Sequence, residues 1–324
     1  MTRMLTGERP TGPLHLGHLF GTVANRVRLQ RSGVETFLVL ADYQVITDRD
    51  VAGDIHGNVR EIVLDYLAAG IDPDTATIFT HSAVPALHQL MLPFLSLVSV
   101  AELERNPTVK QERADSGRSM SGLLLTYPVH QAADILFCHA DVVPVGQDQL
   151  PHLELTRTIA RRFNQRYGPC FPQPEGLLSE APTVLGTDGR KMSKSRGNAI
   201  ELRASADETV RAIRSARTDS DRTITYDPVD RPEVANLLLL ASLCTGVPAE
   251  SIADEIGSAG AGRLKEVVAD ALVEHLAPLR ARRALFAADE GLVVDILAAG
   301  NAHANELADA TIRDVRRRMG MSYG

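Results

Sequence analysis

Two histidines three residues apart, His15 and His18, are the first side chains in the sequence whose type and spacing suit chemistry. They enclose Gly17 and follow a turn rich in proline and glycine, directly before a segment with helical periodicity. A helix start offers unpaired backbone N–H groups and a partial positive charge, which together bind anions. Imidazole N–H groups on one helical turn can donate to phosphate oxygens as charge builds during displacement at phosphorus. Taken alone, the four residues fit a chance pair of surface or core histidines equally well.

A second segment able to bind phosphate reads KMSKS and runs from Lys191 to Ser195, after the turn-prone Asp188-Gly189. Two lysines three apart on a loop can close around a polyphosphate, each as a mobile charge with three donors. Such closure neutralises the leaving group and excludes water. The alternative is an ordinary solvated loop. This alternative is weakened because KMSKS follows HLGH by most of a sheet domain.

An acidic residue, Asp134, lies in an apolar stretch between Ala133 and Ile135. An ionised carboxylate is costly there unless it accepts hydrogen bonds. An indole offers one N–H donor and no acceptor, so a buried carboxylate suits it. Without further information, an Asp satisfied by a neighbouring Arg or a backbone amide is the favoured interpretation.

The first half of the chain must position these groups, and it alternates strand-like and helix-like segments. Strands are predicted at Arg3–Gly7, Thr36–Ala41, Thr75–Thr80 and Asp141–Val145. Helices are predicted at Leu14–Gln30, Ile55–Ala69, Ala86–Val100, Tyr127–Phe137 and Leu150–Gln165. This alternation predicts an α/β fold, a Rossmann-like doubly wound parallel sheet with ligands beyond the carboxyl ends of the strands. The polar stretch Asn106–Ser121 is interpreted as a mobile insertion.

From about Ala206 onward the pattern is helical only, which predicts a second, all-helical domain. Its helices are expected at Asp207–Arg217, Glu233–Thr245, Ala261–Leu285, with Pro278 as a kink, and Asn301–Met319. We divide the chain into a catalytic domain at 1–200 with an inserted segment around 85–125, a helical domain at 201–300 and a basic helix at 301–324.

Composition places few limits on function. With 324 residues, 44% of them hydrophobic, the chain is long enough for two domains. No apolar run approaches a membrane span, and the start lacks the layout of a secretory signal, so a cytoplasmic protein is expected. The net charge of −7 gives no global attraction to nucleic acid. The three cysteines are scattered and are interpreted as free thiols.

HLGH with KMSKS resembles the paired signature of the class I aminoacyl-tRNA synthetases, whose ATP lies between the two motifs. The resemblance implies that an amino-acid carboxylate attacks the α-phosphorus of ATP and that the aminoacyl group then passes to the 3′ end of tRNA. It implies catalytic roles for His15, His18, Lys191 and Lys194. It also implies ATP as a substrate, with Mg²⁺ carried on the phosphates, because no carboxylate cluster suited to the metal is evident.

The middle of the chain resembles the tryptophanyl enzymes in two stretches, Tyr127–Leu136 and Val143–Arg157, so the resemblance spans nearly the whole chain. It implies L-tryptophan and tRNA(Trp) as substrates, a helical domain that meets the anticodon region, and a homodimer. Asp134 would read the indole N–H, and Tyr127 and Gln149 would hold the ammonium group. Three residues depart from the common bacterial enzyme and indicate its divergent second type: Gln44 replaces histidine, Gln131 replaces methionine and Gln147 replaces an acidic residue.

The remaining assignments implied by the resemblance concern ATP. Gly146 and Asp148, with Gln147 between them, would contact the ribose, and Lys110 would reach the phosphates when the enzyme closes. The residues that would line the rest of the ATP site are Arg9, Pro10, Thr11, Gly17, His18, Val184, Lys191, Met192, Ser193, Lys194 and Ser195.

Three alternatives stay open at this point. Tyrosyl enzymes resemble this chain, but they generally place a tyrosine on the first strand, where this sequence has Met4-Leu5-Thr6-Gly7. We assign Thr6 to the substrate pocket. Small-cofactor adenylyltransferases share H-x-G-H but lack KMSKS. A paralogue without aminoacylation activity, acting as a regulatory module, is the third.

Overall fold

The computed structural model describes residues 2–46, 53–110, 119–146, 149–178 and 183–323. Its centre is a sheet of five parallel strands in the order β3-β2-β1-β4-β5. The strands are β1 (Arg3–Glu8), β2 (Glu35–Leu40), β3 (Ala76–Thr80), β4 (Val142–Val145) and β5 (Glu175–Leu178). The chain runs outward from β1 to β3 and then returns to the other side of β1, so the winding reverses between β1 and β4. The predicted doubly wound parallel sheet is confirmed.

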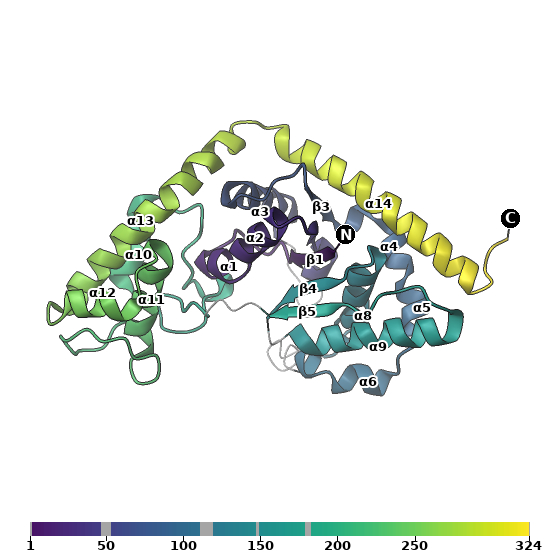
Figure 1. Ribbon diagram of the computed structural model, residues 1–324, viewed down its shortest axis with the longest axis horizontal. Coiled ribbons are helices and arrows are strands. Elements are labelled where there is room, and N and C mark those ends of the chain that lie inside the picture. The colour runs from purple at the N-terminus through teal and green to yellow at the C-terminus, as the bar shows by residue number, and fades with distance from the viewer. Residues whose placement is uncertain (1, 47–52, 111–118, 147–148, 179–182, 324) are drawn as a thin grey trace.

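Helices cover both faces of this sheet (Figure 1). In chain order they are α1 (Leu16–His18), η1 (Leu19–Val23), α2 (Ala24–Arg31), η2 (Asp42–Ile46), α3 (Ile55–Ala69), η3 (His81–Ala83), α4 (Pro85–Gln89), α5 (Met91–Leu95), α6 (Val100–Arg105), α8 (Gly122–Phe137) and α9 (Leu150–Tyr167). The helix α3 has the predicted bounds. It begins at an Asp54 cap and ends at Gly70, whose φ of 105° is left-handed.

The second half of the chain is helical, as predicted. It contains α10 (Ala206–Ser215), α11 (Pro232–Thr245), α12 (Ala249–Ile256), α13 (Gly260–Ala287) and α14 (Leu292–Arg318). In Figure 1, α10 to α13 form a lobe beside the sheet, and α14 runs back along the sheet domain to the C-terminus. In the described part of the chain no single helix has the length and hydropathy of a membrane span, and α11 with α12 reaches both only across a bend of 112°.

The alternation of side chains along β2 divides the core into two layers. Leu38 and Leu40 pack with α2 and α3, and this layer continues without interruption into the apolar core of α10 to α13. Phe37 and Val39 point to the opposite face, where α4, α5, α8, α9 and α14 cover them. The helical lobe therefore shares one hydrophobic core with one face of the sheet.

One predicted helix is wrong: Ala86–Val100 is not continuous. It divides into α4 and α5, and α6 starts separately at a Ser99 cap that closes a capping box with Glu102. Pro93 has no N–H to donate to the carbonyl of Gln89, so the helix is interrupted near Leu90. The strand β5 and the helix α12 were not predicted.

The predicted boundary at residue 300 falls inside α14, which begins at Leu292. Gly300 lets this helix approach the edge strand β3, because a Cβ there would lie 1.9 Å from the carbonyl oxygen of Ile78. Asn301 accepts the N–H of Thr80 at 3.0 Å, and Asn305 donates to the carbonyl of Ala83 at 2.7 Å. The terminal helix thus covers an exposed sheet edge.

Candidate active site

The histidine segment starts just beyond the carboxyl end of β1, next to the point where the winding of the sheet reverses. Ligands of doubly wound sheets bind at such a point. β1 ends at Glu8, and His15 follows as the N-cap of α1. The helical run continues through η1 and α2 to Arg31, so the two histidines occupy the first turn of a long helical segment, as predicted.

The backbone around His15 is anchored from two sides. The carboxylate of Asp65, on α3, accepts a hydrogen bond from the N–H of Leu14 at 3.0 Å. It accepts another from Nε of Arg283, on α13, at 2.7 Å. The N–H of Leu16 donates to the carbonyl of Ile200 at 3.0 Å. The position of His15 therefore depends on α3, on the helical lobe and on the segment that follows KMSKS.

The two histidine rings contact each other, with centroids 3.8 Å apart. The backbone N–H of His15 donates to Nδ1 of His18 at 3.2 Å, so a neutral His18 carries its proton on Nε2. Burial, followed by the neighbouring His18 and Lys194, lowers the pKa of His15 to about 3. Burial also lowers the pKa of His18, although the Glu8 carboxylate opposes this. Both rings are therefore neutral hydrogen-bond donors near pH 7.

A buried ion pair lies beneath His18. Nη2 of Arg26 is 2.9 Å from Oε1 of Glu8, and Nη1 of Arg26 donates to the hydroxyl of Tyr66 at 2.8 Å. Burial would raise the pKa of Glu8, but the neighbouring Arg26 guanidinium, with smaller contributions from His18 and Lys194, lowers it below its ordinary value. The other carboxylate oxygen, Oε2, is 3.9 Å from Nε2 of His18. The Glu8 carboxylate thus favours the tautomer of His18 that keeps Nε2–H.

The lysine loop, residues 191–195, lies against the histidine segment. Nζ of Lys194 donates to the carbonyl of Gly12. Cβ of Met192 lies 3.8 Å from the point where a Cβ on Gly17 would stand, and that added Cβ would also come within 3.0 Å of the ring of His15. Gly17 thus has little room for a side chain. The two motifs are adjacent, and the side chain of Lys191 is exposed at their edge.

Two buried asparagines hold the lysine loop. Asn198 accepts the N–H of Ser193 at 2.8 Å and donates to Asp188 at 2.6 Å. Asn236, on α11, accepts the N–H of Leu185 at 2.7 Å and donates to its carbonyl at 3.3 Å. Because Leu185 forms an antiparallel bridge with Lys191, Asn236 connects the start of the loop to the helical lobe.

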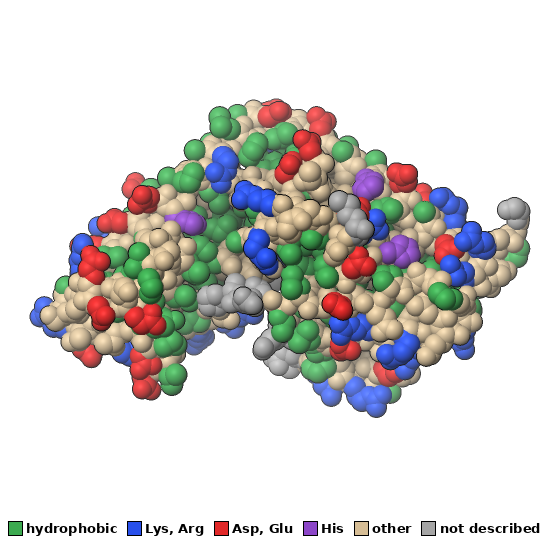
Figure 2. All heavy atoms as spheres, in the orientation of Figure 1, with side chains coloured by type: hydrophobic (Ala, Val, Ile, Leu, Met, Phe, Trp, Pro, Cys, Tyr) green, Lys and Arg blue, Asp and Glu red, His purple; other side chains and the backbone are tan. Residues whose placement is uncertain are grey.

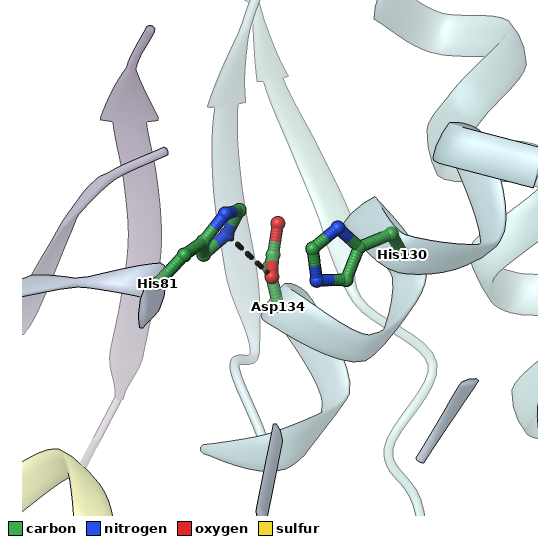
Figure 3. A group of neighbouring side chains, drawn as sticks. All are labelled: His81, His130 and Asp134. Carbon is green, nitrogen blue, oxygen red and sulfur yellow. Dashed lines mark ion pairs between the residues drawn. The ribbon is translucent and has the colours of Figure 1, made fainter. Parts of the chain in front are cut away.

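The predicted substrate-binding carboxylate, Asp134, is buried on α8 and is 4% exposed. Its Oδ1 lies 2.8 Å from Nε2 of His81, which is fully buried. Figure 3 shows Asp134 between His81, from the segment after β3, and His130, from α8 itself. Although burial opposes both charged forms, the pair raises the pKa of His81 and lowers that of Asp134. The carboxylate is thus ionised, and the pairing favours the cationic form of the imidazole.

A chain of hydrogen bonds surrounds this pair. Nε2 of His88 donates to the carbonyl of His81 at 2.7 Å, so Nδ1 of His88 accepts from Nε2 of His130 at 2.8 Å. Nδ1 of His130 then accepts from Nε2 of Gln44 at 2.9 Å. Burial lowers the pKa of His130 to about 4 and also lowers that of His88, in agreement with neutral rings.

His81, His130 and Asp134 lie close enough to share a metal ion, since their ligand atoms are within 4.8 Å of one another. Both ring nitrogens of His130 are already engaged with Gln44 and His88, however. Two ligands from His81 and Asp134 are fewer than the three or four protein ligands of ordinary zinc sites. The cluster fits a structural network around Asp134 better than a metal centre.

Tyr127, the residue assigned to the substrate ammonium, is buried on α8. Its hydroxyl is 2.9 Å from Nε2 of His152, and Nδ1 of His152 is 3.3 Å from the amide nitrogen of Asn106. The amide of Asn106 donates to Nδ1, so Nε2 of His152 carries the proton and donates to Tyr127. The tyrosine hydroxyl is therefore held in place from the inserted segment.

The other residues assigned to the substrate come from β1, η2, α8 and the start of α9. Thr6 is buried on β1, and Gln131 is half-buried on α8. Gln149 is the N-cap of α9, and its N–H donates to the carbonyl of Gly146, directly after β4, at 3.0 Å. Gln44 is buried and reaches His130.

The residues assigned to ATP lie along the turn after β1 and the lysine loop. Arg9 is exposed, and its backbone carbonyl accepts a hydrogen bond from the N–H of Thr11 at 2.8 Å. Pro10 is buried. Val184 is buried and accepts the N–H of Met192 at 3.3 Å. Lys110 is exposed on the inserted segment. Gln147, Asp148 and the side chain of Ser195 lie outside the described residues.

Several residues around the site were not predicted, namely Glu8, Arg26, His81, His88, His130, Asn106 and His152. Each of these residues contributes by holding or polarising another group, and no sequence motif identifies residues of that kind. The spacing of His81 and His88, one on each side of a proline, gave no helical or strand pattern. A signal was present in His130, which lies four residues before Asp134 and hence on the same helical face.

Comparison with known proteins places this geometry in a family. Residues 1–277 match the tRNA synthetases class I (W and Y), and the chain belongs to this family. Within the family it belongs with the tryptophan-tRNA ligases. It is 40% identical to that ligase from Streptococcus pyogenes serotype M1 and 41% identical to that from Treponema pallidum, in each case over 99% of this chain and 98% of the relative.

Solved structures agree. Tryptophanyl-tRNA synthetase from Campylobacter jejuni, in complex with ADP and tryptophan, superimposes with a TM-score of 0.86 at 28% identity, over 98% of this chain and 100% of that one. The tryptophanyl enzyme from Mycoplasma pneumoniae gives a TM-score of 0.84 at 27% identity, over 99% of this chain and 98% of that one. The tyrosyl enzyme from Archaeoglobus fulgidus shares the fold. It superimposes with a TM-score of 0.67 at 23% identity, over 87% of this chain and 90% of that one.

Proposed function

We propose that this enzyme activates L-tryptophan with ATP, forming tryptophanyl-adenylate and pyrophosphate, and then transfers tryptophan to the 3′ end of tRNA(Trp). In the first step a tryptophan carboxylate oxygen bonds to the α-phosphorus, and the bond from that phosphorus to the pyrophosphate oxygen breaks. The observation that carries the proposal is the contact between the lysine loop and the histidine segment at the switch point of the sheet. The relatives at 40% identity support tryptophan rather than tyrosine.

In the ATP half of the site, His15 and His18 donate to phosphate oxygens as neutral imidazoles. Nδ1 of His15 is buried and has no hydrogen-bond partner among the described residues, which suits a ligand-binding role. Lys191 and Lys194 supply positive charge to the leaving pyrophosphate. Since no side chain needs to act as a covalent nucleophile, positioning and charge stabilisation account for catalysis.

The ATP assignments beyond the two motifs follow the shape of the loop. We assign Val184, Met192, Ser193 and Ser195 to the ATP site, together with Arg9, Pro10 and Thr11 of the turn after β1 and with Gly17, which lies next to Met192. Gly146, with Gln147 and Asp148, follows β4 at the switch point, where a ribose would lie. Lys110 reaches the phosphates from the inserted segment, and Mg²⁺ is bound by the phosphates.

In the tryptophan half, Asp134 accepts the indole N–H, and Tyr127 and Gln149 hold the ammonium group. Thr6, Gln44 and Gln131 border the side chain. A buried, ionised carboxylate accepts hydrogen bonds only, which matches the single donor of indole. The hydroxyl of Tyr127 is already oriented by His152.

For tRNA we propose that the lobe of α10 to α13 meets the anticodon region. Figure 2 shows basic and acidic side chains interspersed over the face in view, with a recess between this lobe and the sheet domain. Association must therefore rely on local basic groups and shape. We also propose a cytoplasmic homodimer. Its support is the exposure of Leu92 on α5 and Val100 on α6, which lie within the inserted segment and are 76% and 60% exposed.

Exchange of pyrophosphate into ATP in the presence of single amino acids tests the function. Tryptophan should support exchange at least roughly 10⁴-fold better than tyrosine, because the two side chains differ in hydrogen-bonding groups. Asp134→Ala should abolish most of this activity, and Asp309→Ala, at an exposed position on α14, should leave it intact. Exchange driven by tyrosine, or by no amino acid, would reject the proposal.

A further inference from the structure

We propose that His81 is a positioning residue that sets selectivity for a side chain with an N–H donor, and that Gln44, His130 and His88 hold it in place. The inference rests on the proposed function, since it takes Asp134 as the acceptor that reads the substrate. It assigns roles to three histidines that no sequence motif marks, of which His81 and His130 are buried and His88 is half-buried.

The first step is the contact between His81 and Asp134. The side chains of these residues are 0% and 6% exposed, and the distance from Nε2 to Oδ1 is 2.8 Å. Oδ1 lacks an aligned hydrogen bond within the described chain, so the contact is an ion pair that leaves acceptor capacity on the carboxylate. A buried carboxylate without a cation would take up a proton, because burial disfavours the charged form. The cationic ring of His81 therefore keeps Asp134 a charged acceptor.

The second step is the direction of the surrounding hydrogen bonds. Gln44 donates to His130, His130 donates to His88, and His88 donates to the backbone carbonyl of His81. His130 and His88 each use both ring nitrogens, and the chain ends on the main chain of the residue that pairs with Asp134. It joins η2, α8, α4 and η3, so it fixes the short η3 turn relative to α8. The residue positioned by this chain is His81.

The third step concerns selectivity. A hydrogen bond to an ionised acceptor is roughly twice as strong as one between neutral groups. A substrate without the N–H leaves the desolvated carboxylate with one bond fewer, which costs more for a charged group than for a neutral one. The ion pair with His81 thus enlarges the difference between tryptophan and an isostere that lacks the donor.

The ionisable groups that face Asp134 come from every neighbouring element. Those that act on Asp134 are His81 on η3, His88 on α4 and His130 on α8, and Asp42 on η2 acts in turn on His81 and His130. Asp42 also accepts the N–H of Ser82 at 3.0 Å, directly after His81. Of these groups only His81 contacts the carboxylate as a cation, so its removal should expose Asp134 to protonation in the neutral range.

The experiment compares His81→Asn with wild type in tryptophan-dependent pyrophosphate exchange. The KM for tryptophan should rise roughly 10- to 100-fold while kcat changes less than about 3-fold, because the ground-state contact is lost and the ATP site is untouched. A tryptophan analogue with sulfur in place of the indole N–H serves as second substrate. The ratio of its KM to that of tryptophan should fall at least about 5-fold in the variant.

The pH profile supplies a readout that a merely structural role would not move. In wild type the KM for tryptophan should be constant from pH 6 to 8. In His81→Asn it should increase as the pH falls, because Asp134 then binds a proton. His139→Asn, at a half-buried histidine just past the end of α8, is the matched control and should behave as wild type.

His88→Asn interrupts the chain one bond before His81 and should change KM and the analogue ratio in the same direction by a smaller factor. If His81→Asn does not fold, the KM and the analogue ratio of His88→Asn test the inference instead. An unchanged KM, analogue ratio and pH profile in the folded variant would overturn the inference while wild-type exchange still upholds the proposed function. Absence of tryptophan-dependent exchange in wild type would instead reject the function itself.

Discussion

Lys194 donates a hydrogen bond from Nζ to the backbone carbonyl of Gly12 and so joins two segments 182 positions apart in the sequence. Gly12 has φ of +144°, which other residues rarely adopt, and a Cβ there would approach the Lys194 side chain to 3.2 Å. An ammonium has three donors, so this bond is compatible with bonds to phosphate. The contact places a positive charge next to His15 and His18, at the start of a helical run.

Replacing Lys194 tests the role of this charge. Lys194→Met should lower kcat/KM for exchange by roughly 100-fold or more, because a preorganised donor to the developing charge is lost. The control is Lys265→Met, since Lys265 also donates to a backbone carbonyl, that of Arg214 at 3.0 Å, but lies on α13. A Lys194→Met enzyme within about 3-fold of wild type would remove the lysine loop from catalysis.

The buried, neutral state of His15 predicts a pH dependence of stability. Its pKa is about 3 in the folded chain, against 6.5 for an ordinary histidine, so the unfolded chain binds the proton first as the pH falls. The contribution of His15 to the free energy of unfolding is therefore complete well above pH 6.5 and is lost progressively as the pH falls below it. From pH 7.5 to 5.5 this loss is about 1 kcal/mol.

Urea denaturation at the two pH values checks this prediction. His15→Gln should lose about 1 kcal/mol less than wild type on acidification, whereas His56→Gln, at an exposed position on α3, should lose as much as wild type. Equal losses in wild type and His15→Gln would show that His15 titrates normally.

Asp65 connects the helical lobe to the start of the histidine segment, and its side chain is fully buried. Asp65→Ala should reduce the free energy of unfolding by about 2 kcal/mol, because it removes the acceptor of the Leu14 N–H and one of the two carboxylates that pair with Arg283, the other being Glu61. Glu266→Ala removes an exposed ion pair on α13 and should cost less than about 0.5 kcal/mol. Chemical denaturation measures both, and similar values for the two variants would contradict the proposed anchor.

Tyr127→Phe removes a hydroxyl that His152 holds at 2.9 Å. We expect the KM for tryptophan to rise roughly 10-fold with little change in the KM for ATP, since one polar contact with the ammonium group is lost. Tyr323→Phe, at a position that is 93% exposed, is the control. A rise in the ATP KM alone would move Tyr127 out of the amino-acid pocket.

The sequence predicted the sheet and both motifs well because hydrophobic periodicity and motif spacing are local properties. The helix α3 had the right bounds because Asp54 and Gly70 mark its two ends. The division of Ala86–Val100 was missed although Pro93 signalled it, and β5 has only four residues with mixed exposure. The start of α14 was missed because Gly300 is usually a helix breaker, whereas here it permits contact with β3.

At the site, the sequence identified groups that we assign to the substrates but not the residues that hold those groups. Asp134 was predicted to need a partner, and the structure supplies His81 from a segment 53 positions earlier in the chain (134 − 81). Such pairing depends on how β3 and α8 meet in space, which periodicity does not contain. The same holds for Asp65, whose bond to Leu14 spans 51 positions.

A crystal structure with a nonhydrolysable ATP analogue and tryptophan tests the central claim most directly. We predict that the triphosphate lies between the His15 and His18 rings on one side and Lys194 on the other, within hydrogen-bond distance of each, with the indole N–H on Asp134. A triphosphate bound elsewhere, with these side chains turned away from it, would contradict the account.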